Sequence, residues 1–146
     1  MKDYQYLIVG GGMTAAAATD GIREVDPTGL IGLTGAEPDA PYDRPPLSKA
    51  LWKGKSLDAI WRKSVDKGIT LHLGRVAKEI IPKQSLVVDD NGDVFTYQKL
   101  LLATGGCVYS AAVSAGRAAN DYTARAIPDY LGIAVPQEAA QILWQH

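Results

Sequence analysis

The chain has 146 residues, enough for one domain with a hydrophobic core but not for two. Apolar residues make up 47% of it and the formal net charge is −1, which excludes intrinsic disorder and gives no electrostatic basis for binding nucleic acid or an anionic membrane. Cys107 is the only cysteine, which excludes an internal disulfide, a Cys-x-x-Cys redox pair and a thiolate metal site.

The first 35 residues predict a strand, a glycine turn, a helix and a second strand. Residues 4–9 (YQYLIV) are a short apolar run of the kind found in buried strands. This run is too short for a signal peptide or a membrane span, so we expect a cytoplasmic protein. The alanine-rich stretch 13–25 predicts a helix, and residues 30–35 (LIGLTG) predict a second buried strand. Together they form a βαβ unit with parallel strands.

The middle of the chain predicts shorter elements. Two short helices are expected at 47–53 and 56–68, and residues 69–74 predict a third strand. Asn91-Gly92 lies between apolar runs and predicts a hairpin, with residues 76–81 as a neighbouring strand. Residues 99–106 (KLLLATGG) predict a further buried strand, and 137–144 could form a short helix.

The glycine turn carries a nucleotide-binding pattern. Gly10, Gly12 and Ala15 fit G-x-G-x-x-(G/A) between a strand and a helix. The first glycine permits the tight turn, the second lets a pyrophosphate approach the backbone, and the small third residue lets helix and strand pack closely. The helix N-terminus at Met13 and Thr14 offers N–H groups to phosphates. The alternative is a glycine turn with a purely structural role.

A dinucleotide fold also needs a carboxylate after the second strand to bind ribose hydroxyls. Glu37 follows Gly35 by two positions and is the nearest candidate, because Ala36 cannot serve. The alternative for Glu37 is a solvated loop acid.

The stretch 40–49 (APYDRPPLSK) is a stiff, charged loop. Three prolines reduce its conformational freedom before a ligand arrives, and so lower the ordering cost of binding. Arg44 offers a planar guanidinium that can fork onto oxygens, and Lys49 offers a compact ammonium. The alternative is a polyproline surface turn with solvated charges.

Four segments resemble one enzyme family: LIVGGGMTAAAA, GLTGAEPDAPYDRPPLSKALW, LHLGRVAKEI and VFTYQKLLLATGG. Together they cover residues 4–106 and resemble the N-terminal FAD-binding segment of flavin-dependent NAD(P)H oxidoreductases, the pyridine nucleotide-disulfide oxidoreductase-like family that includes ferredoxin, rubredoxin and putidaredoxin reductases and apoptosis-inducing factor. The resemblance implies an α/β, Rossmann-like FAD/NAD(P)-binding fold with a parallel sheet and a small antiparallel β-meander, incomplete relative to the family. It implies an N-terminal part of the FAD-binding domain at 1–106 and a divergent connector at 107–146.

The resemblance also implies roles for particular residues. Arg44 would contact the ribose and pyrophosphate of FAD, and Lys49 would act catalytically near the N5 edge of the flavin, where hydride arrives. Backbone at Val76 and Ala77 would contact adenine. Backbone at the strand end would lie close to the pyrophosphate, at Ala103, Thr104 and Gly105. No metal ligand is implied.

The function implied is hydride transfer from NAD(P)H to FAD, then electron transfer to an external acceptor such as ferredoxin or rubredoxin. Residues 125–133 (RAIPDYLGI) resemble the family's connector to the NAD(P)-binding domain, so the chain is expected to be a truncated form without the NAD(P)H site. This chain alone is not expected to turn over.

Two alternatives to an enzyme remain open. One is a non-catalytic module that binds FAD or another nucleotide. The other is a non-functional truncation product, or a half-protein that needs a complementing chain or self-associates, because an incomplete sheet exposes strand edges and apolar surface. The proline-rich loop argues against an ordinary NAD-dependent dehydrogenase.

Overall fold

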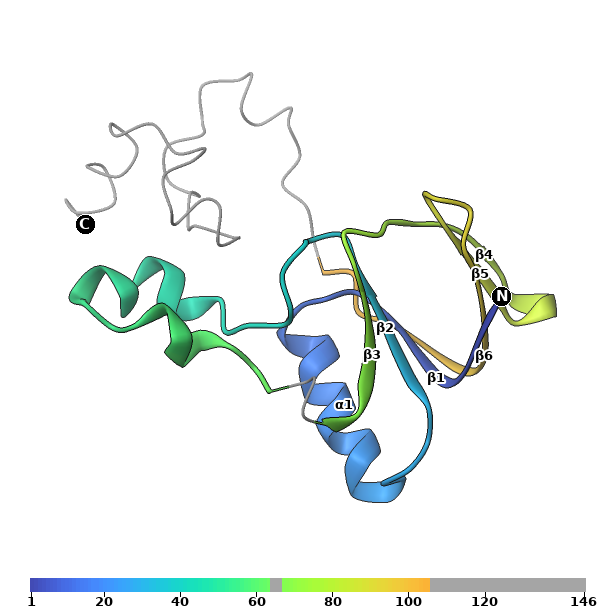
Figure 1. Cartoon of the computed structure of the whole chain (residues 1–146), viewed down its shortest axis with the longest axis horizontal. Helices are drawn as coiled ribbons and strands as arrows, with labels where there is room; N and C mark the ends of the chain where they lie inside the picture. The colour runs from blue at the N-terminus through green and yellow to red at the C-terminus, as the bar shows by residue number, and fades with distance from the viewer. Residues whose placement is uncertain (64–66, 106–146) are drawn as a thin grey trace, which may run out of the picture. The chain divides into compact units, whose positions relative to one another are not determined.

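The computed structural model describes residues 1–63 and 67–105 (Figure 1). They belong to two compact units. The first, called here the sheet unit, comprises Met1–Tyr42 and Trp61–Gly105; the described part of the second, the proline-loop unit, is Asp43–Ile60. Cys107, the connector-like stretch at 125–133 and the short helix expected at 137–144 lie outside the described residues.

The described part of the sheet unit contains one α-helix and six strands, besides the 3₁₀ turn η5 (Pro82–Gln84). In chain order these are β1 (Lys2–Val9), α1 (Met13–Val25), β2 (Ile31–Gly35), β3 (Ile69–Leu73), β4 (Ala77–Ile81), β5 (Leu86–Asp89) and β6 (Val94–Leu102). The strands form a sheet of order β3-β2-β1-β6-β5-β4. The pairs β3–β2, β2–β1 and β1–β6 are parallel, whereas β6–β5 and β5–β4 are antiparallel. This confirms the predicted parallel sheet with a small antiparallel meander.

Helix α1 covers one face of the parallel strands (Figure 1). Buried Ala15 packs there with aliphatic side chains from β1, β2 and β3, namely Ile8, Ile31, Leu33 and Ile69. The helix has the predicted bounds. It ends as the sequence predicts, because the Asp26 carboxylate accepts the N–H groups of Thr28 (3.2 Å) and Gly29 (2.7 Å). A side chain that caps its own loop in this way competes with further helical hydrogen bonds.

A second core lies between β1 and the antiparallel meander. Because side chains alternate along a strand, Leu7 and Val9 point away from the face that Ile8 occupies. They pack with Val87 of β5 and Phe95 of β6, and all four side chains are buried. The meander therefore covers part of the sheet that would otherwise face water.

The Asn91-Gly92 hairpin forms between β5 and β6. The Gly92 N–H donates to the Asp89 carbonyl (3.1 Å), and Gly92 takes a φ of +80°, which suits glycine. The Asp89 carboxylate accepts the N–H groups of Asn91 (2.9 Å) and Asp93 (2.8 Å). The predicted hairpin is confirmed.

The structure corrects the prediction of a separate buried strand at 99–106. Residues 94–102 form one strand, β6, which pairs with β5 at its start and with β1 along its length. Leu101 and Leu102 are 36% and 56% exposed, so this part of the strand is not buried as expected.

The described part of the proline-loop unit contains 3₁₀ turns in place of the predicted helix at 47–53 and of the start of the helix predicted at 56–68, of which residues 64–66 lie outside the described residues. These are η1 (Pro45–Ser48), η2 (Leu51–Lys53) and η3 (Leu57–Ile60). The backbone of Lys49 leaves the helical region between η1 and η2 (φ −134°, ψ −82°), and Gly54 ends η2 at a φ of +84°, so the segment forms short i→i+3 turns rather than one longer helix. Ser56 accepts the Asp58 N–H (3.2 Å), which matches its predicted role at the start of a helical turn.

Candidate nucleotide-binding site

The carboxyl ends of β1, β2, β3 and β6 meet at one edge of the sheet, because these strands are parallel (Figure 1). Val9 pairs in register with Thr34 on one side and with Leu102 on the other. Four short segments therefore follow at this edge: 10–12, 36–37, 74–76 and 103–105. They contain most of the site residues predicted from the sequence.

Gly10 lies in a tight turn where only glycine fits. It takes a φ of +129°, and a Cβ there would overlap the carbonyl of Ala103. Two backbone hydrogen bonds hold the contact, from Gly10 N–H to the Thr34 carbonyl and from Ala103 N–H to the Val9 carbonyl, both 2.7 Å. The structure thus brings the predicted residues Gly10 and Ala103 into direct contact.

Gly12 stands in a different environment. A Cβ built on Gly12 meets no atom within 4 Å, and its φ of −90° is open to any residue. Packing within the described chain therefore does not require glycine here. The space beside Gly12 is therefore open, as the pattern expects where the protein backbone approaches a pyrophosphate.

The first turn of α1 is open to an anion. Gly12 provides no side-chain cap, and no acidic residue occurs in that turn. The N–H groups of Met13, Thr14 and Ala15 have no acceptor four residues earlier within the helix. Together with the helix dipole they favour a bound phosphate.

Small residues let the turn lie against β2. A Cβ on Gly35 would come within 3.1 Å of the Gly11 Cα, and Ala15 is fully buried. This is the close packing that the third position of the glycine pattern predicts.

Glu37 is held by a tyrosine of the proline-rich stretch. The Tyr42 hydroxyl donates to Glu37 Oε2 (2.7 Å), and Tyr42 is 2% exposed. The Tyr42 ring meets Trp61 edge-on, with centroids 5.8 Å apart. The Glu37 carboxylate is thus oriented at the end of β2, half-buried rather than fully solvated. Sequence reasoning did not assign this role to Tyr42.

The segment Gly74–Val76, which leads from β3 to β4, is tied to the end of β2. Gly74 N–H donates to the Glu37 carbonyl and Arg75 N–H to the Gly35 carbonyl, both 2.9 Å. Val76 is 40% exposed at this edge, and Ala77 begins β4.

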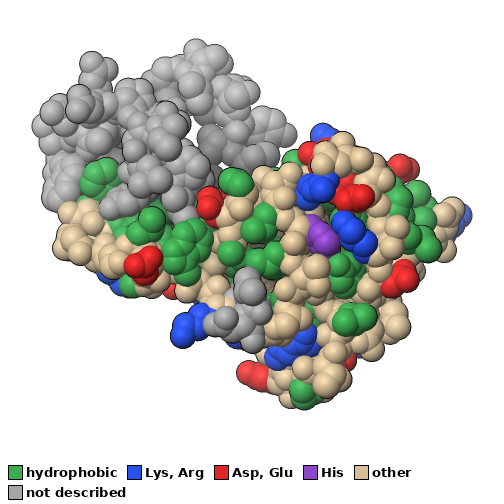
Figure 2. Space-filling model, in the orientation of Figure 1, with side chains coloured by type: hydrophobic (Ala, Val, Ile, Leu, Met, Phe, Trp, Pro, Cys, Tyr) green, Lys and Arg blue, Asp and Glu red, His purple; other side chains and the backbone are tan. Residues whose placement is uncertain are grey.

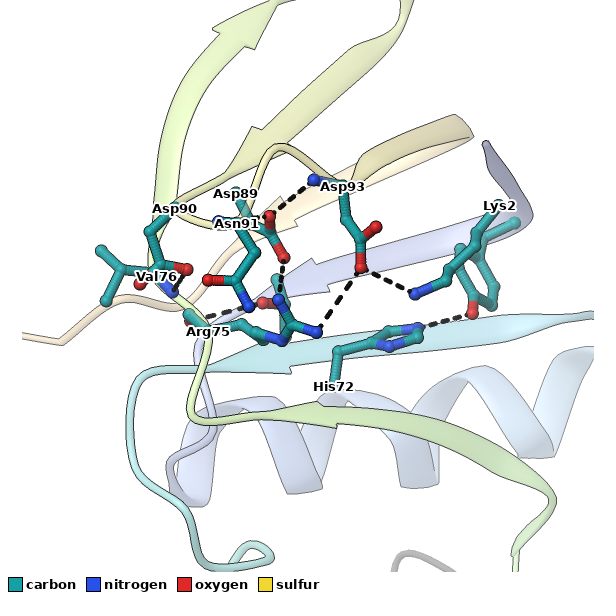
Figure 3. A network of polar contacts seen from close by, with 10 residues as sticks. Lys2, His72, Arg75, Val76, Asp89, Asp90, Asn91 and Asp93 are labelled. Atoms are coloured by element: carbon teal, nitrogen blue, oxygen red, sulfur yellow. Dashed lines mark hydrogen bonds and ion pairs between the residues drawn. The ribbon is translucent and has the colours of Figure 1, made fainter.

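A charged network lies behind this segment (Figure 3). Arg75 pairs with Asp89 (3.4 Å) and with Asp93 (3.6 Å), and Asp93 also pairs with Lys2 (3.0 Å). Side chains of both charges gather around a histidine on the face drawn in Figure 2. Sequence reasoning missed this network, because its members are far apart in the chain. The hairpin signal at Asn91-Gly92 was the one indication that the side chain of Asp89 is held in a turn.

His72 borders the network and shares a hydrogen bond with Tyr4, from ring Nε2 to the tyrosine oxygen (2.7 Å). Burial lowers the pKa of His72 below its ordinary 6.5, and the positive charge of Lys2 lowers it further. The Lys2 ammonium holds the pKa of Asp93 below its usual value through a hydrogen bond and its charge.

Arg44 and Lys49 lie in the proline-loop unit. Arg44 immediately precedes η1, and Lys49 follows it and donates its N–H to the Pro46 carbonyl (3.1 Å). The contact of these two side chains with a nucleotide stays a prediction. Within residues 1–63 and 67–105, no cluster of three or more metal-ligating side chains occurs and no helix is long and apolar enough to cross a membrane.

A glycine turn and an open helix N-terminus at the carboxyl edge of parallel strands define a Rossmann-like dinucleotide-binding fold. Comparison with known proteins gives the family. The chain belongs to the pyridine nucleotide-disulphide oxidoreductase family, whose family model matches residues 4–143. The resemblance noted in the sequence is confirmed.

Individual relatives agree with this. The chain is 35% identical over 134 residues to the 5,5'-dehydrodivanillate O-demethylase ferredoxin reductase subunit of Sphingobium sp., covering 88% of this chain and 32% of that protein. It is 30% identical over 125 residues to apoptosis-inducing factor 1, mitochondrial, of Dictyostelium discoideum, covering 73% and 24%.

Among solved structures, the fold is similar to that of the covalent putidaredoxin reductase–putidaredoxin complex, with a TM-score of 0.73 and 27% identity. The match covers 91% of this chain and 34% of that chain. The chain therefore spans about a quarter to a third of the length of the relatives it matches.

Proposed function

We propose that this chain is the FAD-binding portion of a flavin-dependent NAD(P)H oxidoreductase that passes electrons to an external acceptor such as ferredoxin or rubredoxin. The observation that carries the proposal is the Gly10 turn, whose backbone leaves no room for a side chain beside Ala103, next to an uncapped helix N-terminus. The relatives named as ferredoxin reductases support the same reaction class.

The residues at the sheet edge fit a dinucleotide. Open space at Gly12 and the absence of an acidic residue in the first turn of α1 suit a pyrophosphate. The Glu37 carboxylate suits a ribose hydroxyl, and the exposed Gly74–Val76 segment suits the adenine. The residues proposed to hold FAD are Gly10, Gly12, Met13, Thr14, Ala15, Glu37, Arg44, Lys49, Val76, Ala77, Ala103, Thr104 and Gly105.

When bound, FAD supplies an isoalloxazine ring that accepts a hydride and returns electrons to an acceptor. The chain's own residues bind and orient it. Arg44 would neutralise ribose and pyrophosphate oxygens through its planar guanidinium. Lys49 would place a positive charge near the flavin N5, where it stabilises negative charge on the reduced ring.

The chain is proposed to divide into an FAD-binding part at 1–106 and a connector at 107–146 toward an NAD(P)-binding domain. Hydride delivery would then depend on residues beyond those described, in a complementing chain or a longer protein. A second candidate function is a non-catalytic FAD-binding module. The residues at the sheet edge favour it, because the role proposed for each of them is to hold FAD.

The proposal is tested by retention of flavin. The purified chain is incubated with FAD, freed of excess, and its visible spectrum recorded beside Gly12→Ala, Arg44→Ala and Lys49→Ala. We expect bound flavin in the wild type and weaker binding in Gly12→Ala and Arg44→Ala. Gly12→Ala separates binding from folding best, because the added Cβ meets no atom within 4 Å. The free energy of unfolding should therefore change by no more than about 1 kcal/mol.

Each outcome has a distinct meaning. A folded wild type that retains no flavin would contradict FAD binding by this chain. Addition of NADH to the flavin-loaded chain then tests hydride transfer: bleaching of the flavin shows that this chain accepts hydride by itself, and an unchanged spectrum shows that this chain alone serves only to bind FAD.

A further inference from the structure

The turn between β5 and β6, residues 89–93, is called here the meander tip. It is joined to the segment Gly74–Val76 by a reciprocal pair of hydrogen bonds. The Asp90 N–H donates to the Val76 carbonyl (2.9 Å), and the Val76 N–H donates to Asp90 Oδ1 (3.1 Å). Asp90 is thus bonded to both backbone groups of one residue at the candidate site.

A second contact joins the same two segments. Arg75 reaches the carboxylates of Asp89 and Asp93 (Figure 3), and the side chain of Asp89 is 1% exposed. The Nη1 of Arg75 and the Oδ2 of Asp89 are buried and make no hydrogen bond to the described residues, so they face each other as an ion pair. Removing Arg75 leaves the buried Asp89 carboxylate without its ionic partner.

The other side of the segment is bonded to the end of β2, through Gly74 and Arg75. Three consecutive residues are therefore held from two directions, although Val76 is 40% exposed and Gly74 takes a φ of +64°. An exposed loop with this many anchors is ordered before a ligand arrives, which lowers the cost of binding.

We propose that Asp90, with the buried pair Arg75–Asp89 behind it, is a positioning residue that holds the Val76 backbone for the adenosine half of a bound nucleotide. This inference rests on the proposed nucleotide site and adds the meander tip to it. The meander then has a role in binding, besides covering the sheet.

ADP is the probe, because it contains the adenosine and pyrophosphate without the flavin. Its affinity for the full chain is measured by titration calorimetry for wild type, Asp90→Ala, Asp90→Asn and the control Glu79→Gln. Glu79 is an exposed carboxylate on β4, so this control removes the same charge from the meander away from the tip. We expect about tenfold weaker ADP binding for Asp90→Ala.

Asp90→Asn should largely restore affinity, since its amide oxygen can still accept the Val76 N–H. Glu79→Gln should bind as the wild type does. A purely structural role for Asp90 predicts a lower unfolding temperature without ligand and unchanged affinity of the folded fraction, and this result would overturn the inference.

Failure of the two proposals is distinguishable. No ADP binding by a folded wild type overturns both the nucleotide site and the positioning role. Normal ADP binding by Asp90→Ala overturns the positioning role alone. Should Asp90→Ala not fold, deuterium exchange at the Val76 amide of the wild type decides: slower exchange with ADP supports the role, and unchanged exchange contradicts it.

Discussion

Two glycines of one turn, Gly10 and Gly12, have different surroundings. At Gly10 the carbonyl of Ala103 occupies the space of a side chain and the backbone takes a left-handed φ. At Gly12 neither restriction exists. The pattern alone shows both as glycines, and only the packing shows that the fold requires glycine at position 10 and not at position 12.

This difference predicts that Gly10→Ala destabilises the fold itself. The strained φ and the overlap with the β6 end should lower the free energy of unfolding by about 2 kcal/mol or more. Denaturant unfolding without ligand measures it, with Gly12→Ala as the control. Equal stability of the two variants would contradict the described contact between the glycine turn and Ala103.

His72 predicts a pH dependence of stability. Its folded-state pKa is lowered by burial and by Lys2, against the opposing charges of Asp93 and Asp89. The unfolded chain therefore binds this proton more tightly, so stability is fully present above pH 6.5 and is lost as pH falls toward the folded-state pKa. The lowered pKa of Asp93 adds a separate loss that begins below its ordinary 3.8.

The measurement is the free energy of unfolding from about pH 7 to about pH 5, in wild type and His72→Gln. Glutamine keeps a polar group beside Tyr4 but does not titrate. We expect the free energy of unfolding of the wild type to decrease as the pH is lowered. In the variant it should depend less on pH. The same slope in both proteins would assign the effect to other groups.

At the scale of elements, the N-terminus of α1 lacks features that would stabilise the helix but would oppose a bound anion. An uncapped helix start without acidic residues is less stable than a capped one. The same absence of negative charge suits a phosphate.

Thr14→Asp should therefore change stability and binding in opposite directions. Thr14 is exposed in the first turn, where a carboxylate stabilises the helix by about 0.3–1 kcal/mol. The same charge should repel a pyrophosphate and weaken ADP binding. Thermal unfolding and ADP titration test both effects, with the uncharged Thr14→Asn as the matched control. Stronger or unchanged ADP binding would argue against a phosphate at this helix.

At the scale of the whole molecule, β6 links the parallel and antiparallel parts of the sheet. It pairs with β1 over its length, whereas its register with β5 covers only Val94–Thr96. Beyond that point, no described strand pairs with its other edge, and exposed Leu101 and Leu102 lie there. A strand edge with apolar side chains is a site for association with another chain.

We expect the chain to self-associate as its concentration rises, unless a complementing chain is present. Sedimentation velocity measures this, with Leu102→Lys as the variant, because a charged side chain on an edge strand opposes pairing. The variant should shift toward monomer, and the exposed Lys99→Arg serves as a control on the same strand. Equal association of wild type and Leu102→Lys would place the contact elsewhere.

The sequence by itself determined the local elements and the chemistry of the edge. The period of apolar residues and the glycine pattern predicted α1 with its bounds, the strands β1, β2 and β3 and the hairpin, because these signals come from neighbouring residues, and the family resemblance implied the fold class. Tertiary structure decided the rest. The continuity of β6, the contact of Gly10 with Ala103, the bond from Tyr42 to Glu37 and the pairing of Arg75 with Asp89 each join residues whose meeting depends on strand order and burial. The predicted helix at 47–53 and the described start of the one at 56–68 are 3₁₀ turns, and between η1 and η2 the backbone of Lys49 leaves the helical region, which helix propensity alone does not show.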